Sequence, residues 1–518
     1  MKKNKKINYD YLNKLNVPMN QEIPSFVSWN WPLIRKVTFF VFLSSIFAAC
    51  AAVVGMMYNL PKQCNPEVPW YKGSVFYEIF PASFKDSNGD GLGDLRGLAS
   101  QVDYLQNLSI GAVRLNSIFP STQYPEKYND ITSLMKIDKV LGDFDDLAKL
   151  IALLHERNIS LILDLPLSLF DKLSPSTMEN MTMLAKNISD DSQAEEYRRI
   201  ERDIIDDNTI TNVMRFWLSK GVDGFYLKGL ENFSDDQYLM ENVREWKYVL
   251  GKDRVLMVNQ SLIEDVKDNV ADEILQCIDL VDVFLPISNG TQAIANQINE
   301  LMISKLRPTE NGAWIHWSLN GVEQRRVSSG ISPNASLTGL LMMLMLPGTP
   351  SIFYGDEISM EESHDPLNEH EETKHLHHLP AMNWRDDDTQ FTKHNILPWL
   401  PKTAAVHYQQ LEYIIEAIRM RKRTPSLYKN IIIKDGVGEL LNLQIRANKN
   451  DLLMIERSYP RRSTFISITN LGDKRLSLDL SALYYSGELV IGPAKKNKVF
   501  FTDFELRSLE TVIVKLDK

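Results

Sequence analysis

From position 70 onward, short apolar runs alternate with longer amphipathic stretches. Eight of these runs have the length of β-strands, and segments of helical length separate them. The predicted strands cover residues 75–80, 112–116, 160–165, 224–227, 255–258, 281–285, 313–317 and 351–354. The helical pattern is clearest over residues 147–154. Repetition of strand and then helix predicts an α/β fold, a (β/α)₈ TIM barrel, at residues 70–425.

After a predicted helix at residues 407–421, the pattern changes to short strands punctuated by turns. The predicted strands cover residues 452–459, 463–469, 475–480, 488–491 and 511–516. A turn such as Asn470-Leu471-Gly472-Asp473 is typical of antiparallel connections. Residues 426–518 are therefore predicted to form a C-terminal antiparallel β-sandwich domain.

Near the N-terminus, residues 37–57 form an apolar run without a single charge. As a helix, this run spans about 31 Å, close to the hydrocarbon thickness of a bilayer. The alternative is a cleaved signal peptide, but the run exceeds the roughly 7–15 apolar residues of a signal core. We predict a cytoplasmic tail at residues 1–36, a transmembrane helix at 37–57 and an extracellular neck at 58–69.

Flanking charges set the expected orientation of this helix. Only Asp10 and Glu22 are acidic before the span, whereas the basic residues there are Lys2, Lys3, Lys5, Lys6, Lys14, Arg35 and Lys36. The positive-inside rule then predicts a single-pass type II protein whose C-terminal ectodomain is extracellular. Small residues fall at helical spacings along the span, namely Ser44, Ala48, Ala51, Ala52 and Gly55. This stripe is able to pack against a partner helix, although a simple anchor with ordinary small residues has the same pattern.

Charge and glycosylation motifs agree with an ectodomain. The chain has 518 residues and a formal net charge of −10, which argues against nucleic acid as a partner. Asn-x-Ser/Thr motifs occur only after the predicted span. The predicted glycosylation sites are Asn107, Asn180, Asn187, Asn232, Asn289 and Asn334. The motifs at Asn158 and Asn259 are expected to lie too close to the sheet to be glycosylated.

Three cysteines have three different settings. Cys50 lies in the predicted span and Cys277 in an apolar stretch, where each is expected to act as a small hydrophobic residue. Cys64 lies in the polar neck, seven residues past the span. A lone exposed cysteine in an oxidising space suggests an intermolecular disulfide.

Three segments resemble the α-amylase family of glycosidases. They are residues 76–95 (FYEIFPASFKDSNGDGLGDL), 161–165 (LILDL) and 347–358 (PGTPSIFYGDEI). Their order and spacing match the first, third and eighth barrel strands of that family. The resemblance covers the chain from Trp70 to the C-terminus, because the family also carries a C-terminal β-domain.

The same resemblance implies that the catalytic residues have been replaced. Glycosidases of this kind need a carboxylate nucleophile, a carboxylic acid and a further aspartate that binds sugar hydroxyls. By alignment, Lys228, Gln260 and Val322 take these three positions. The arginine that normally precedes the nucleophile by two residues is Tyr226, and the usual Asn-His pair after the third strand is Ser168-Leu169. We therefore predict a protein with no catalytic residues of this type, a pseudoenzyme.

Two further clusters invite a metal interpretation. Calcium is the cofactor that oxygen ligands at Asp86, Asn88, Asp90, Asp94 and the carbonyl of Leu92 would bind, and the resemblance implies such a site. A polar turn held by side-chain hydrogen bonds explains the same residues. The second cluster is His370, His375, His377 and His378. Its spacing matches no standard zinc pattern and favours a solvated acidic loop.

An inactive barrel, a single span and a neck cysteine together resemble the heavy chains of heteromeric amino-acid transporters. The resemblance implies a plasma-membrane glycoprotein, disulfide-linked through Cys64 to a multi-pass light chain that it traffics and stabilises. The short connection at residues 166–222 favours the cell-surface antigen type of heavy chain, while the calcium-like loop departs from that type. A membrane-tethered α-glucosidase and a lectin or receptor that uses the inactive barrel remain the alternatives.

Overall fold

The computed structural model describes most of the chain. The described residues are 25–59, 65–167, 209–309, 312–363, 376–384, 408–434, 438–448, 451–493 and 497–517. The chain divides into two compact units, residues 1–66 and 67–518, which are treated separately below.

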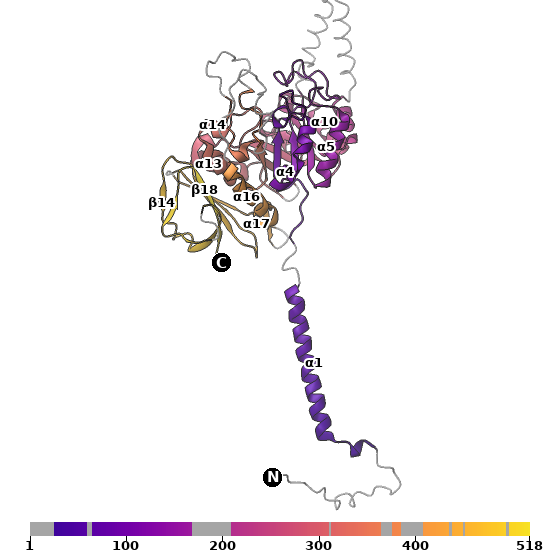
Figure 1. Cartoon of the computed structure of the whole chain (residues 1–518), viewed down its shortest axis with the longest axis vertical. Helices are drawn as coiled ribbons and strands as arrows, with labels where there is room; N and C mark the ends of the chain where they lie inside the picture. The colour runs from indigo at the N-terminus through magenta and orange to yellow at the C-terminus, as the bar shows by residue number, and fades with distance from the viewer. Residues whose placement is uncertain are drawn as a thin grey trace, which may run out of the picture. The chain divides into compact units, whose positions relative to one another are not determined.

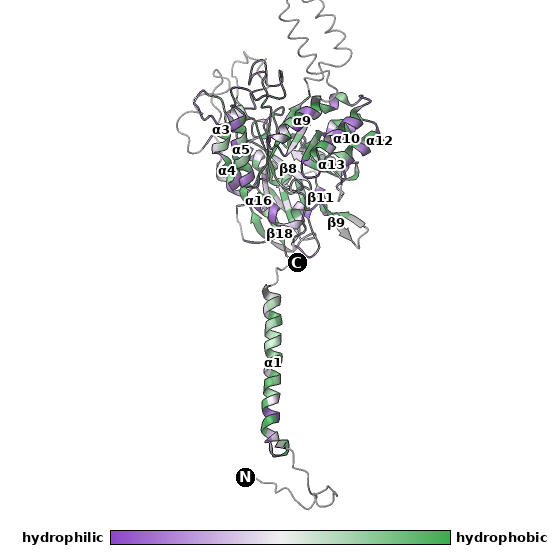
Figure 2. Ribbon diagram, turned by 90° about the vertical axis from the view of Figure 1, so that its right-hand side faces the viewer, coloured by the Kyte–Doolittle hydropathy of each residue, from purple (hydrophilic) through white to green (hydrophobic). Residues whose placement is uncertain are grey.

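In the first unit, α1 (Trp31–Asn59) follows a short 3₁₀ turn, η2 (Ser25–Ser28). Pro32 stands in the first turn of α1, where its missing N–H costs no hydrogen bond. The segment from Trp31 to Met56 is long and apolar enough to cross a membrane, which Figure 2 shows as a largely green helix. The helix begins six residues before the predicted start, because Arg35 and Lys36 are good helix formers and continue it.

The second unit contains the predicted barrel, in which eight parallel strands close in chain order (Figure 1). The strands are β1 (Phe76–Ile79), β2 (Ala112–Leu115), β3 (Ser160–Pro166), β4 (Gly224–Lys228), β5 (Val255–Asn259), β6 (Leu280–Phe284), β7 (Trp314–Ser318) and β8 (Thr349–Phe353). Nearly every strand residue is buried, as expected where helices cover the outer face of a parallel sheet. The predicted TIM barrel is confirmed.

Helices and short turns connect the strands. Before β5 they are α2 (Pro81–Phe84), α3 (Leu95–Ser100), α4 (Val102–Leu108), α5 (Phe144–Glu156), α9 (Thr209–Ser219), η3 (Leu230–Phe233) and α10 (Leu239–Leu250). After β5 come α11 (Gln260–Asp265), α12 (Asp268–Cys277), η4 (Ile287–Asn289), α13 (Gly290–Ile303), α14 (Val327–Gly330), α15 (Pro333–Met343), η5 (Asp356–Ile358), η8 (Tyr408–Gln410), α16 (Leu411–Arg423) and α17 (Pro425–Tyr428).

The amphipathic pattern explains α5, for example. The Asp143 carboxylate caps its N-terminus by accepting the Asp146 N–H, while Leu147, Leu150 and Leu154 face the core.

The C-terminal region forms antiparallel sheets, as predicted. Its strands are β9 (Ile431–Lys434), β10 (Gly438–Leu441), β11 (Leu443–Ala447), β12 (Leu452–Arg457), β13 (Phe465–Asn470), β14 (Leu476–Leu478), β15 (Ser486–Ile491), β16 (Lys498–Phe500), β17 (Phe504–Leu506) and β18 (Glu510–Leu516). Six of them form one sheet in the order β11-β12-β13-β18-β15-β16. The pairs β9–β10 and β14–β17 form two smaller sheets, and α13 and α15 of the barrel pack against the large one.

Two buried arginines join the barrel to these sheets. Arg421 of α16 donates to the carbonyls of Leu344 and Leu346, at 2.6 and 2.9 Å, and to that of Gly348 at 2.6 Å. Arg457 of β12 donates to the Met345 carbonyl at 2.8 Å. The acceptors lie in the segment between α15 and β8, so this loop is tied from both sides.

Candidate functional site

A cavity of about 330 Å³ opens at the carboxyl ends of the barrel strands. This is the end at which TIM barrels place their functional groups, because the strand termini and following loops converge there. Polar side chains dominate the lining, including five amides, Asn116, Asn259, Gln260, Asn320 and Gln324. The cavity is therefore suited to a polar guest and not to an apolar one.

All three residues predicted to replace catalytic groups line this cavity. Lys228 ends β4, Gln260 directly follows β5, and Val322 follows β7. Parallel strands bring these positions together although about 90 residues separate the first from the last. Ser168 and Leu169 lie outside the described residues.

The ammonium of Lys228 forms an ion pair with Glu323 on the loop after β7. Lys228 Nζ lies 2.6 Å from Glu323 Oε1 and 5.7 Å from the centre of the Tyr128 ring. Burial disfavours the charged ammonium, but Tyr128 and Glu323 outweigh it, so the pKa of Lys228 is raised. Burial also opposes ionisation of Glu323, yet Lys228 holds the pKa of that carboxyl below its usual value. Both groups are therefore charged at neutral pH.

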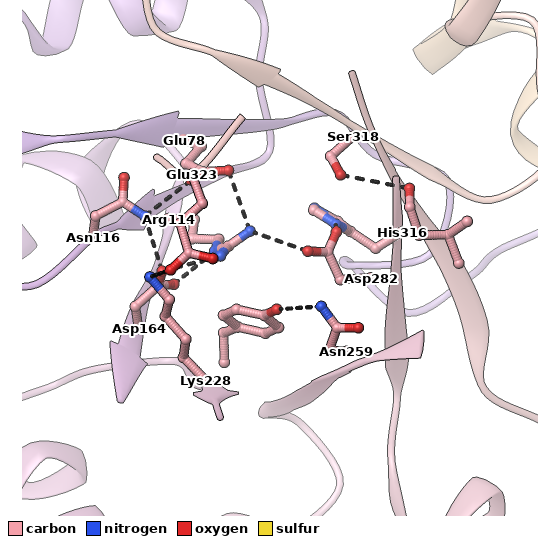
Figure 3. Close-up of polar contacts among 12 residues, drawn as sticks. Glu78, Arg114, Asn116, Asp164, Lys228, Asn259, Asp282, His316, Ser318 and Glu323 are labelled. Atoms are coloured by element: carbon pink, nitrogen blue, oxygen red, sulfur yellow. Dashed lines mark hydrogen bonds and ion pairs between the residues drawn. The ribbon is translucent and has the colours of Figure 1, made fainter. Parts of the chain in front are cut away.

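Deeper in the cavity, Arg114 of β2 is surrounded by three carboxylates (Figure 3). It donates to Asp164 through Nε at 2.6 Å and Nη2 at 3.0 Å, and to Glu78 through Nη1 at 3.2 Å. Asp282 Oδ2 lies 3.8 Å from Nη1. Burial favours the neutral guanidine, but these acids raise the pKa of Arg114 well above its ordinary value. The bidentate pair fixes the guanidinium plane in the middle of the cluster.

Three carboxylates face one guanidinium, and the pKa of Glu78 reflects this excess of acid. Asn116 donates from Nδ2 to Glu78 at 3.0 Å and to Asp164 at 2.9 Å. Burial raises the pKa of Glu78 to about 7, against the opposing attraction of Arg114. Asp282 differs, because a hydrogen bond at 2.7 Å from His316 Nδ1 helps to hold its pKa below the usual value despite its burial. The pKa of Glu78 thus lies near neutral pH, in contrast to that of Asp282.

The Arg114 guanidinium also stacks on Tyr226. Its central carbon lies 4.0 Å from the ring centre, and Asn259 Nδ2 donates to the Tyr226 hydroxyl at 3.4 Å. The family resemblance expects an arginine at position 226 of β4. Here Tyr226 takes that position, and Arg114 of β2 places a guanidinium over its ring.

Sequence reasoning missed this cluster. Its signal is the presence of charged residues inside apolar strands, namely Glu78, Arg114, Asp164 and Asp282. Charges buried in this way are rare and need partners.

The calcium-like loop is held by its own hydrogen bonds. Asp86 accepts the N–H groups of Asn88, Gly89 and Gly91, at 2.9, 2.7 and 2.8 Å. Asp90 accepts the Leu92 N–H at 2.8 Å, and Asp94 caps α3. No group of three or more acidic, histidine or cysteine side chains within the described ranges is arranged to hold a metal ion. The described geometry is that of a polar turn, and calcium binding at residues 86–94 remains a prediction.

The predicted glycosylation sites, cysteines and histidines differ in how exposed they are. Asn107, Asn232, Asn289 and Asn334 are exposed, and so is Asn158, which lies two residues before β3. Cys277 is half-buried and not fully buried, and Cys50 is exposed on α1 together with most of the small-residue stripe. His378 is buried and contacts the Val322 carbonyl through Nε2. Cys64, Asn180, Asn187, His370 and His375 lie outside the described residues.

Comparison with known proteins gives two groups of relatives. The α-amylase catalytic-domain family model matches residues 78–167. Alpha-amylase 3 of Dictyoglomus thermophilum is 27% identical over 478 residues, 82% of this chain and 92% of that protein. The amino acid transporter heavy chain SLC3A1 of Homo sapiens is 23% identical over 457 residues, 72% of this chain and 66% of that protein. A mutant of the trehalulose synthase MutB in complex with Tris has a TM-score of 0.66 at 18% identity, over 87% of this chain and 100% of its own.

These matches support placing the barrel in the α-amylase superfamily, as the motifs predict. Homologues at 22% to 24% identity over most of the chain are transporter heavy chains, which confirms the predicted resemblance. Amylases and glucosidases are equally close relatives, including the oligo-1,6-glucosidase of Bacillus cereus at 29% identity over 42% of this chain. The finer assignment to the antigen type stays a prediction.

Proposed function

We propose that this protein is the non-catalytic heavy subunit of a heteromeric amino-acid transporter. It is linked through a disulfide at Cys64 to a multi-pass light chain, which it brings to the plasma membrane and stabilises there. Heavy-chain relatives over most of the chain and the apolar helix α1 support a membrane-anchored, transporter-associated role. The sequons and the basic tail support a type II orientation, with the ectodomain outside the cell.

The Lys228–Glu323 ion pair is the observation that carries the non-catalytic part of this proposal. At the end of β4, where a glycosidase of this family needs a nucleophilic carboxylate, an ammonium lies 2.6 Å from the carboxylate of Glu323, on the loop after β7. A positive charge there repels the oxocarbenium-like transition state, and the pair removes the free carboxylate of Glu323 from use. Gln260 cannot donate a proton as a general acid does.

The disulfide gives the decisive experiment. On a non-reducing gel, the wild-type chain from cell membranes is expected to run as a larger species that collapses when reductant is added. Cys64→Ser should abolish this species, whereas Cys277→Ser should leave it intact because that half-buried thiol lies at the end of α12. Mass spectrometry of the released protein identifies the light chain.

Two outcomes contradict the proposal. A monomer under both conditions removes the covalent light chain, and a disulfide-linked homodimer favours a receptor. Transport is expected to persist in part in Cys64→Ser, because non-covalent contacts also hold subunits together.

A tethered α-glucosidase is the enzyme alternative, favoured by the equally close amylase relatives and by Glu78, whose pKa of about 7 suits a general acid. We expect no hydrolysis of maltose or of a nitrophenyl α-glucoside by the purified protein. Lys228→Asp alone should not restore turnover, because Gln260 still lacks a proton to give. Wild-type hydrolysis that Glu78→Gln abolishes would establish the enzyme instead.

The polar cavity supports a lectin or receptor as a third possibility, since its amides resemble the hydrogen-bonding groups that bind sugar hydroxyls. A glycan array probed with the protein separates this function from the transporter role. Calcium at residues 86–94 is proposed only as a structural ion.

A further inference from the structure

The C-terminal region carries a two-stranded ribbon that stands apart from its main sheet. β9 and β10 pair with each other, so that Leu440 lies opposite Ile432 and Leu441 opposite Ile431. Among the described strands, neither joins the six-stranded sheet or the β14–β17 pair. Figure 2 shows β9 projecting from the rest of the unit. An isolated ribbon of two strands is only marginally stable in water, so its ends must be held.

Buried asparagines hold the ribbon at its root, where β9 begins and β10 ends. Asn430 precedes β9, Asn442 follows β10, and both are fully buried. The Asn430 Oδ1 atom accepts the Gly348 N–H at 2.9 Å. Asn442 donates to the Lys429 carbonyl at 2.7 Å and accepts from Arg457 at 2.9 Å. The direction in which the ribbon projects is therefore set in advance, which lowers the entropic cost of binding.

The two faces of the ribbon differ. Residues directly opposite in an antiparallel pair share a face. On one face Ile431 is buried and Leu441 packs against the core. On the other face Leu440 is 54% exposed and Ile432 is half-buried. The outward face therefore presents two aliphatic side chains, Ile432 and Leu440, close to the root of the ribbon.

The root of the ribbon lies beside the start of the second unit. Lys429 Nζ donates to the Glu67 carbonyl at 3.4 Å. Gly73 lies against Tyr428, the residue before Lys429, since a side chain at position 73 would meet the Tyr428 carbonyl at 2.5 Å. Cys64 precedes Glu67 by three residues, which limits their Cα separation to about 11 Å. A protein bonded to Cys64 is therefore within reach of the ribbon.

We propose that the outward face of the β9–β10 ribbon, centred on Leu440, is the docking surface for the protein that Cys64 holds. This inference rests on the proposed function and names the surface through which the partner is recognised. The occupant is an aliphatic segment of that partner, because Ile432 and Leu440 offer apolar side chains beside the covalent link. A second copy of this chain and membrane lipid are the competing occupants.

Photo-crosslinking tests the proposal in cells that produce the full-length chain. A photo-reactive p-benzoylphenylalanine replaces Leu440, and the protein captured on irradiation is compared with the one that reductant releases from Cys64. The two are expected to be the same polypeptide. Capture of a second copy of this chain, of lipid, or of no protein overturns the proposal. The control places the same residue at Leu483, an exposed leucine elsewhere in the region, which should not capture that polypeptide.

A binding measurement complements the capture. In a Cys64→Ser background, Leu440→Glu should lower the amount of partner that co-purifies by roughly tenfold. Leu483→Glu should leave that amount unchanged. Leu440 is exposed, so the melting temperature should not fall, which separates lost docking from unfolding.

The outcomes distinguish failure of the proposed light-chain function from failure of the ribbon proposal alone. If wild-type protein shows no reductant-sensitive species, both the light-chain function and the ribbon proposal fail. If that species forms and Leu440→Glu recovers as much partner as the parent, only the ribbon proposal fails.

Discussion

Buried guanidinium groups serve two regions of this molecule in opposite ways. At the barrel mouth, Arg114 lies among Glu78, Asp164 and Asp282, and their charges raise its pKa. At the seam between the barrel and the C-terminal sheets, Arg421 and Arg457 donate to carbonyls, and burial lowers the pKa of Arg421 to about 9. Arg457 likewise has a pKa well below its usual value because of burial.

The difference teaches what each region is built for. Carbonyls are neutral acceptors, so the seam ties a loop in place without bringing titratable partners into the interior. The barrel mouth instead carries an excess of acid beside a cavity, an arrangement typical of sites that handle polar ligands or protons. If this distinction holds, the stability contributed by the mouth changes between pH 5.5 and 8. That of the seam does not change over this range, because the lowered pKa of Arg421, about 9, still lies above it.

The largest expected effect comes from removing the cation at the mouth. Arg114→Met leaves Asp164 and its neighbours buried without a counter-charge, which should cost about 3–5 kcal/mol of unfolding free energy at pH 7.5. The loss should shrink at pH 5.5, because protonation relieves the acids. Chemical denaturation at the two pH values measures it. Lys228→Met is the control, with an expected cost of about 0–1 kcal/mol, because Glu323 is half-exposed. An equal loss at both pH values would contradict the ionic account.

Arg421→Met tests the seam. It leaves the carbonyls of Leu344, Leu346 and Gly348 without their donor and should cost about 2–4 kcal/mol. The same cost is expected at pH 5.5 and pH 8, because these acceptors do not titrate. Arg419→Met, an exposed arginine on the same helix, provides the control and should cost less than about 1 kcal/mol. A marked pH dependence for Arg421→Met would erase the distinction between the regions.

The smallest effect concerns Glu78 in the otherwise unchanged protein. Its folded pKa of about 7 exceeds the ordinary value of 4.5, so the native state holds a proton that the unfolded state has lost. Stability should therefore fall as pH rises from about 4.5 to 7, by at most roughly 3 kcal/mol from this group. Glu78→Gln should flatten part of this slope. Glu357, whose pKa burial also raises to about 7, supplies a similar remaining slope. An identical pH profile in Glu78→Gln would show that Glu78 does not titrate there.

Much of the barrel could be predicted from the sequence, and the reason is local. Each buried parallel strand is a short apolar run, and all eight runs gave strands close to the predicted bounds. The C-terminal region was harder. The strands β9, β10, β11, β16 and β17 were missed. For the first three, the run from Ile431 to Ala447 lacks clear alternation, and its pairing depends on the buried Asn430 and Asn442.

The candidate site, too, could be predicted only in part from the sequence. The sequence alone predicts that Lys228, Gln260 and Val322 lie close together, because the carboxyl ends of barrel strands always meet. The stacking of Arg114 on Tyr226 could not be predicted, since it depends on which side chains of β2 and β4 point into the barrel at the same height. The Lys228–Glu323 pair depends on the path of the loop after β7, which no periodic pattern encodes.

That ion pair also bears on how such a barrel evolves. Returning an acid to position 228 would place it beside Glu323, which loses its ammonium in the same step. Two carboxylates that face the same partly buried cavity raise each other's pKa, which favours the protonated and poorly nucleophilic form of the new acid. A proton donor at position 260 would bring no gain before that acid ionises. Under the proposed non-catalytic function, single substitutions toward catalysis would therefore bring no selective gain, and the ion pair would keep the lineage in that function by epistasis.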